Sequence, residues 1–149
     1  MSDSAVLLLV VHLVGTAAMT GLIWFVQVVH YPLFASVGPD RFVAYEASHT
    51  RQTAWVVGPF MAVEGVSALA VSATLRDEVG PVLVLAGLAL LAVIHTSTVA
   101  LQVPAHTRLS EEFDGPTQVR LVRTNWIRTV GWSLRTLVAG AMIVVVVAA

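Results

Sequence analysis

Four long apolar stretches limit most strongly what this chain can fold into. A helix that crosses a bilayer needs roughly 20 mostly apolar residues. The stretches that reach this length are Ser4–His30, Thr53–Leu75, Gly80–Val103 and Asn125–Ala149. They take up most of the 149 residues, of which 57% are hydrophobic and only 11% charged. We therefore predict an all-α fold, a four-helix transmembrane bundle that forms a single integral membrane domain over residues 1–149.

The polar segments between these stretches differ in length. Arg76–Pro81 is a tight charged turn, whereas Tyr31–Gln52 and Pro104–Thr124 are longer. Within the first long connection, Pro39-Asp40 is followed by Phe42, Val43, Tyr45 and Glu46. This pattern predicts one short amphipathic helix at the membrane interface.

The distribution of arginine predicts an orientation. With four spans, both termini lie on the side of Arg76, and the two long connections lie on the other side. That other side holds Arg41, Arg51, Arg108, Arg120, Arg123 and Arg128. By the positive-inside rule the long connections are cytoplasmic, which predicts a multi-pass protein of the bacterial inner (plasma) membrane with both termini outside.

Composition excludes several classes of function. Eight Arg and no Lys oppose nine Asp and Glu, so the chain has no basic field to attract a nucleic acid. The absence of Cys removes thiolate nucleophiles and Cys-ligated metals. Any metal must be held by His, carboxylate or amide groups.

Polar side chains from all four predicted helices gather at the cytoplasmic end. His30, His49 and His106 are the expected metal ligands, and imidazoles suit iron, copper or zinc, while paired His also ligate haem. At about 100° per residue, His95, Gln102 and His106 share one stripe, and Asn125, Arg128, Trp132 and Arg135 share another. The residues expected to bind a cofactor are Gln27, Gln102, Asn125 and Trp132.

A second, deeper layer is expected near the middle of the membrane. Glu64, His95 and Arg135 lie at similar depth, where an ionisable group costs about 2.5–3.5 kcal/mol unless it finds a partner. We assign catalytic roles to these three residues and to Arg128: Glu64 as ligand or base, His95 in proton exchange, and the two arginines in holding the substrate. His12 is expected near the opposite membrane face, outside this constellation.

Three functions are compatible with these residues. The first is a metal- or haem-dependent oxidoreductase or oxygenase-like enzyme that acts on a lipophilic or quinone-like molecule. The second is a binding or transport module in which Glu64, His95 and Arg135 relay protons or anions, which predicts a homo-oligomer because four spans are few for a transporter. The third is a structural membrane subunit in which the Glu64–Arg135 pair only joins helices.

Three motifs carry a resemblance to known families. Trp24-Phe25-Val26-Gln27-Val28-Val29-His30-Tyr31-Pro32, Gln102-Val103-Pro104-Ala105-His106 and Arg123-Thr124-Asn125-Trp126-Ile127-Arg128-Thr129 together resemble an uncharacterised family of small four-pass bacterial integral membrane proteins. That resemblance implies the topology and no reaction. The size and layout are also similar to the anthrone oxygenase-like membrane family, which implies a polycyclic aromatic substrate. His12-Leu13-Val14-Gly15, with Trp24-Phe25 downstream, is similar to the first helix of membrane protoporphyrinogen oxidases and of copper-resistance membrane domains, in which a His near the start of that helix can bind haem.

Overall fold

The computed structural model describes residues 2–148, which are almost entirely helical and include no strand. The chain forms four long helical rods. The first joins α1 (Asp3–Phe25), the π-helix η1 (Val26–His30), α2 (Tyr31–Leu33) and the 3₁₀-helix η2 (Phe34–Ser36), and the second is α3 (Pro39–Thr74). After the short α4 (Arg76–Val79), the third joins α5 (Pro81–Ser97), the π-helix η3 (Thr98–Gln102) and α6 (Val103–Leu109), and the fourth is α7 (Gly115–Ala148).

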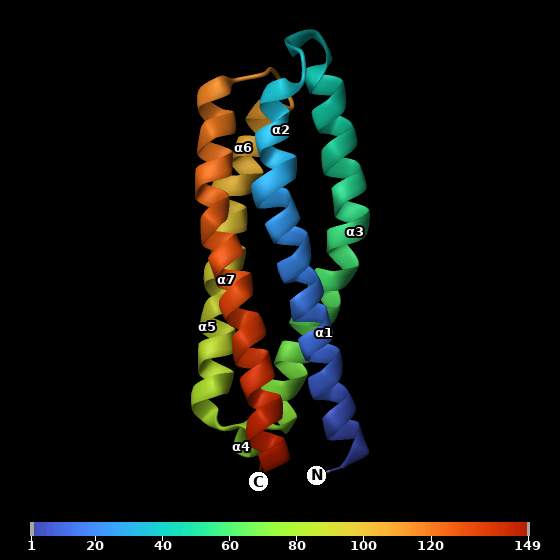
Figure 1. The fold of residues 1–149 in the computed structure, drawn as a ribbon, viewed down its shortest axis with the longest axis vertical. Coiled ribbons are helices and arrows are strands. Elements are labelled where there is room, and N and C mark those ends of the chain that lie inside the picture. Colours follow the sequence, from blue (N-terminus) through green and yellow to red (C-terminus); the bar gives the residue numbers. More distant parts are fainter. Residues whose placement is uncertain (1, 149) are drawn as a thin grey trace.

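The rods form an antiparallel bundle, as predicted (Figure 1). All four are long and apolar enough to cross a membrane. The N-terminal end of α1 and the C-terminal end of α7 lie at the same end of the bundle as α4 (Figure 1). The turns that follow η2 and α6 lie at the other end (Figure 1). We call the latter the polar end, because the predicted His cluster lies near it.

The two long connections are helical rather than open loops. The helix predicted from Pro39 onward is present, but it continues without a break into the second rod. The predicted connection between residues 104 and 124 likewise divides between α6 and α7, with only residues 110–114 outside the helices. The physical reason is burial: Phe34, Phe42, Leu109 and Leu121 are 0% exposed and pack together at the polar end.

Local polar contacts fix the start of α7. The Thr117 backbone N–H donates to Asp114 Oδ2 at 3.2 Å, as in a helix N-cap. The Arg108 guanidinium lies 3.1 Å from the same oxygen. A hydrogen bond from the Thr117 hydroxyl, together with the charge of Arg108, holds the pKa of Asp114 below its ordinary value.

Each π-helix ends two residues before a proline. η1 precedes Pro32 and η3 precedes Pro104. Proline has no N–H, and its ring displaces the carbonyl four residues earlier, so a wider turn accommodates it. Such π-turns are frequent at functional sites. Here η1 ends at His30 and η3 ends at Gln102, four residues before His106.

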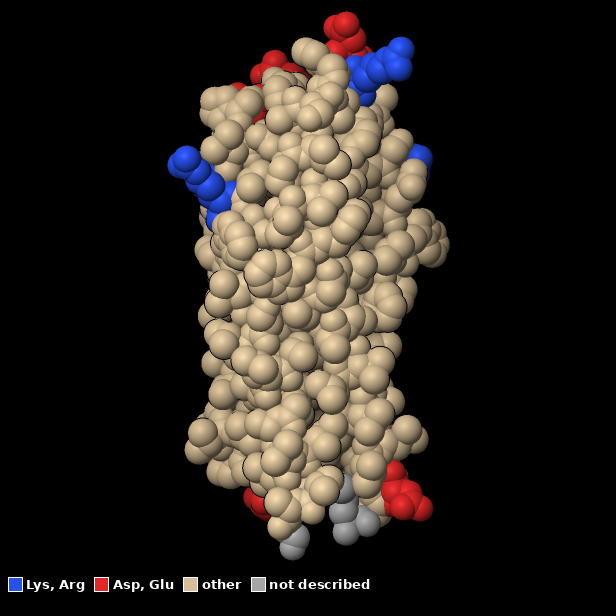
Figure 2. Space-filling model, viewed as in Figure 1, with Lys and Arg blue, Asp and Glu red and all other residues tan. Residues whose placement is uncertain are grey.

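The outer surface of the bundle is apolar over its middle. Figure 2 shows charged side chains only toward the two ends of the visible face, with an uncharged band between them. Apolar side chains such as Leu7, Val66 and Leu137 are more than 60% exposed. A soluble protein rarely exposes a contiguous apolar surface of this kind, so the four rods indicate a multi-pass membrane protein.

Close helix packing at Gly131 gives a first testable prediction. A Cβ atom at Gly131 on α7 would lie 2.7 Å from Ile94 Cγ1 on α5, and Ile94 is fully buried. We expect Gly131→Ala to lower the free energy of unfolding by about 1–3 kcal/mol, the usual cost of overpacking. Equilibrium unfolding in detergent measures this.

Gly140→Ala is the matched control on the same helix. No atom of residues 2–148 lies within 4 Å of a Cβ at Gly140, and alanine is the better helix former. Equal stability of the two variants would show that α5 and α7 are not closely packed at Gly131.

Candidate functional site

The three histidines predicted as metal ligands come together at the polar end. His30 Nε2 lies 2.7 Å from His49 Nδ1, and Thr53 Oγ1 lies 3.1 Å from the same nitrogen. The rings of His49 and His106 are stacked, with centroids 5.4 Å apart. η1 supplies His30, α3 supplies His49 and α6 supplies His106, so three rods contribute to the cluster.

Two residues that the sequence analysis did not assign to this cluster complete it. His106 Nδ1 lies 2.5 Å from Glu46 Oε1, and His106 Nε2 lies 2.8 Å from the Tyr31 hydroxyl. Glu46 is 0% exposed, and its Oε2 has no hydrogen-bond partner among the described residues. The spacing Glu46-x-x-His49 indicates that Glu46 belongs with His49, because residues three apart lie on the same face of a helix.

Glu46, His49 and His106 lie close enough together to hold a metal ion. One ligand atom from each residue lies within 4.8 Å of the others. Since His30 and Thr53 occupy His49 Nδ1, the other ring nitrogen of His49 is free to act as a ligand. A bound ion would replace the hydrogen bond between His106 and Glu46, and would use a carboxylate that is otherwise half satisfied.

A chain of amide hydrogen bonds positions Arg128 beside the cluster. Asn125 Nδ2 donates to Gln27 Oε1 at 2.9 Å, and Gln27 Nε2 donates to the Val122 carbonyl at 3.1 Å. Arg128 then donates from NH1 to Asn125 Oδ1 at 3.1 Å. Gln27 and Asn125, predicted to bind a cofactor, therefore orient Arg128 and do not line the cavity beside it.

That cavity has a volume of about 520 Å³ and lies between α3 and the third rod. Its polar walls include Tyr31, His49, His106, Gln102 and Arg128, and the rest is mainly apolar. Gln102 Oε1 and Arg128 Nε are buried without a partner, and Arg128 forms no ion pair with any residue between 2 and 148. Unpaired buried groups of this kind carry a cost that a polar ligand would remove.

Trp132, predicted to contact a cofactor, lies elsewhere. It is fully buried with Met19, Ile23 and Ile94 in the core and does not line the cavity. All members of the predicted stripe from Asn125 to Arg135 are buried, as their spacing predicts, but the stripe is long enough to pass from the polar end into the core. Trp126, on the same helix, is 44% exposed and packs edge-on against Trp24.

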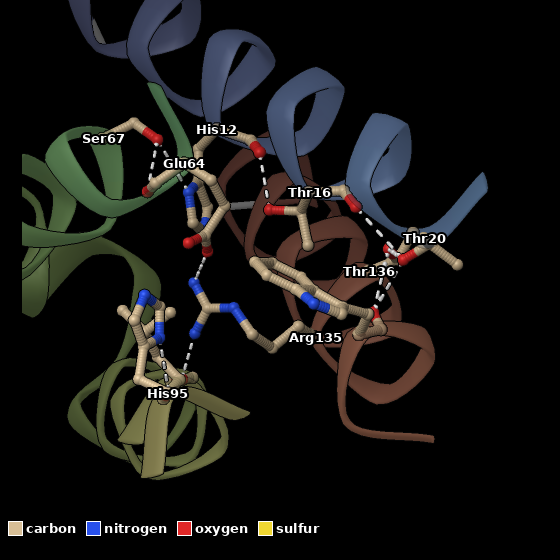
Figure 3. Close-up of polar contacts among 11 residues, drawn as sticks. His12, Thr16, Thr20, Glu64, Ser67, His95, Arg135 and Thr136 are labelled. Atoms are coloured by element: carbon tan, nitrogen blue, oxygen red, sulfur yellow. Dashed lines mark hydrogen bonds and ion pairs between the residues drawn. The ribbon is translucent and has the colours of Figure 1, made fainter. Parts of the chain in front are cut away.

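The predicted middle layer contains a buried ion pair. Arg135 NH2 contacts Glu64 Oε1, and Arg135 NH1 donates to the Gly87 carbonyl (Figure 3). Glu64 is 0% and Arg135 2% exposed. The pair therefore links α3 and α7, and the guanidinium also binds α5.

The two remaining histidines differ in their relation to this layer. His12 lies inside the bundle, with Nδ1 3.0 Å from Ser67 Oγ, and Ser67 donates to the Glu64 carbonyl (Figure 3). The expectation that His12 lies near the membrane edge is therefore wrong, because its position nine residues into α1 already reaches the layer. His95 lies nearby, but its only hydrogen bond within the described chain joins Nδ1 to the Leu91 carbonyl at 3.0 Å.

Comparison with family models, with curated proteins and with solved structures finds no match for this chain.

The buried ion pair gives the second prediction. Glu64→Leu would leave the Arg135 charge unpaired in the core, and we expect it to lower the free energy of unfolding by about 3–5 kcal/mol. Arg135→Met should have a similar effect. The double variant should be more stable than either single variant, because it removes both charges and keeps apolar volume.

Equilibrium unfolding of the four proteins forms a double-mutant cycle. Additive losses in the double variant would contradict a direct interaction between Glu64 and Arg135.

Proposed function

We propose that this protein is a metal-dependent membrane oxidoreductase that acts on a lipophilic substrate at the polar end of the bundle. The observation that carries the proposal is the placement of Glu46, His49 and His106. Their ligand atoms lie together beside a cavity that also exposes the unpaired Arg128 and Gln102. A metal and a substrate would thus meet in one place.

The ligand set favours a non-haem metal ion. Two imidazoles and one carboxylate are the typical ligands of non-haem iron(II), and leave further coordination positions open for oxygen chemistry. Copper and zinc also bind imidazole and carboxylate groups, but this ligand set is less typical of them than of iron(II). A haem fits poorly, because the stacked rings of His49 and His106 leave no space for a macrocycle between them.

The other residues of the site have supporting roles in this proposal. His30 contacts His49 Nδ1, so a metal would bind the other ring nitrogen of His49 and His30 would orient the ring. Tyr31 does the same for His106. Arg128 and Gln102 offer a positive charge and an amide to a polar substrate group, while apolar residues of α3 bind the remainder.

The contacts of the middle layer favour a structural role over a relay of protons or anions. Glu64 and Arg135 are paired with each other, and the cavity beside His12 has a volume of about 10 Å³, which holds one water molecule at most. A proton path across the bundle needs more polar groups than that. We therefore assign the chemistry to the polar end, and assign to the ion pair the joining of three helices.

We also propose that the polar end faces the cytoplasm of a bacterial cell. Six arginines lie toward that end, and Arg76 lies at the other.

Because the chain has no Cys, single Cys substitutions report topology cleanly. We expect Glu78→Cys to react with a membrane-impermeant maleimide in intact spheroplasts, and Glu111→Cys to react only after permeabilisation. The reverse pattern would place both termini inside.

Metal binding gives the fourth prediction. Purified protein should hold close to one equivalent of metal, and His49→Ala, His106→Ala and Glu46→Gln should each lose it, because each removes a ligand. His30→Ala should weaken binding by about 10–100-fold, the usual effect of removing a group that orients a ligand. Elemental analysis and titration calorimetry with iron(II) and zinc measure this.

His95→Ala is the matched control, since His95 lies outside the cluster and bonds only to its own helix. Metal retained in the His49→Ala and His106→Ala variants, or lost in His95→Ala, would overturn the site.

A further inference from the structure

Two cavities lie along the same side of the bundle and meet at Met61. The first is the cavity beside the metal ligands. The second, of about 460 Å³, lies between α3 and α5 farther from the polar end, and Met61 lines both. The two cavities therefore adjoin at Met61, and we call them together the lateral groove.

The lateral groove has a polar and an apolar part. Arg128 and Gln102 lie in the first cavity, and both have buried atoms without a partner. The second cavity is lined by Met61, Ala62, Gly65, Val66, Leu69, Leu88, Leu91, Ala92 and His95. One end of the groove therefore suits a charged group, and the other suits hydrocarbon.

Small residues keep the groove open toward the lipid. Gly58 lines the first cavity and Gly65 the second, and nothing lies within 4 Å of a Cβ built on either. Being seven residues apart, they lie on one face of α3. Val66 and Leu69 beside them are 69% and 63% exposed, so the groove opens to the side of the bundle, where a molecule dissolved in a bilayer would enter.

We propose that the lateral groove binds a single-chain amphiphile with an anionic head group. A carboxylate or phosphate head would pair with Arg128 and accept from neighbouring donors, since a guanidinium binds such groups through two hydrogen bonds. The chain would run along α3 past Met61 to the level of His95. From Thr53 to Leu69 this path is roughly 24 Å long, which suits a long acyl chain.

This inference rests on the proposed function in one respect: it takes the amphiphile to be the substrate, whose head would lie beside Glu46, His49 and His106. The binding itself does not require the metal. It also separates an anionic lipid from a quinone-like molecule, because a neutral head would leave the Arg128 charge unpaired.

The test measures binding of a naturally fluorescent fatty acid, cis-parinaric acid, and of the corresponding alcohol to metal-free protein in detergent. Wild-type protein should bind the acid at least tenfold more tightly than the alcohol. Arg128→Gln should remove that difference, and Gln102→Leu should reduce it. Displacement by a long-chain alkyl phosphate as well as by a fatty acid would show that the site recognises either anion, and displacement by the fatty acid alone would restrict it to carboxylates.

Gly65→Leu tests the apolar part, because Gly65 lines the second cavity and the added side chain would occupy part of it. It should weaken binding of both probes at least tenfold. Gly21→Leu is the control, since Gly21 also has nothing within 4 Å but lines neither cavity; its affinities should equal those of wild type. Equal binding of acid and alcohol, or no effect of Gly65→Leu, would overturn the proposal.

Metal content separates this result from the proposed function. If the acid binds in an Arg128-dependent way while the protein takes up no iron or zinc, the amphiphile site stands and the metal-dependent enzyme fails. If metal binds and the acid does not, the proposed enzyme stands and its substrate is of another class.

Discussion

The buried ion pair between Glu64 and Arg135 is the interaction on which the arrangement of the bundle depends. Apolar packing, such as that of Ile94 against Gly131, brings the helices together, and a buried polar contact adds a stricter condition on their register. A carboxylate and a guanidinium at the core are costly unless they meet. Their contact, together with the bond from Arg135 to the Gly87 carbonyl, therefore fixes the heights of α3, α5 and α7 relative to one another.

That register has a consequence at the polar end. His49 lies fifteen residues before Glu64 on α3, and Arg128 lies seven residues before Arg135 on α7. Because both helices are fixed at the middle layer, these side chains reach the polar end at a defined height. The two layers differ in how well their polar groups are satisfied. In the middle layer Glu64 and Arg135 pair with each other, whereas the polar end has a cavity beside Arg128, which forms no ion pair with any described residue.

The sequence predicts the rods and the grouping of His30, His49 and His106 because helical rise and apolar length determine both. Glu46 was not predicted as part of the cluster, although it lies three residues before His49, because it lies in a polar segment between the apolar stretches. Burial of Phe34 and Phe42 extends the helices past the apolar stretches. Trp132 was wrongly predicted to contact a cofactor. The stripe on its helix shows which face is buried, but it does not show which residues cover that face.

The π-helices connect the local sequence to the chemistry. A regular α-helix through Pro32 or Pro104 would place a carbonyl against the proline ring, and the wider turns that avoid this also rotate the residues that follow. His106 follows η3 by four residues and reaches both Glu46 and Tyr31. The prolines near the polar end thus do more than end a helix. They set the direction of the side chains that join the third rod to α3, across a gap that the lateral groove otherwise leaves open.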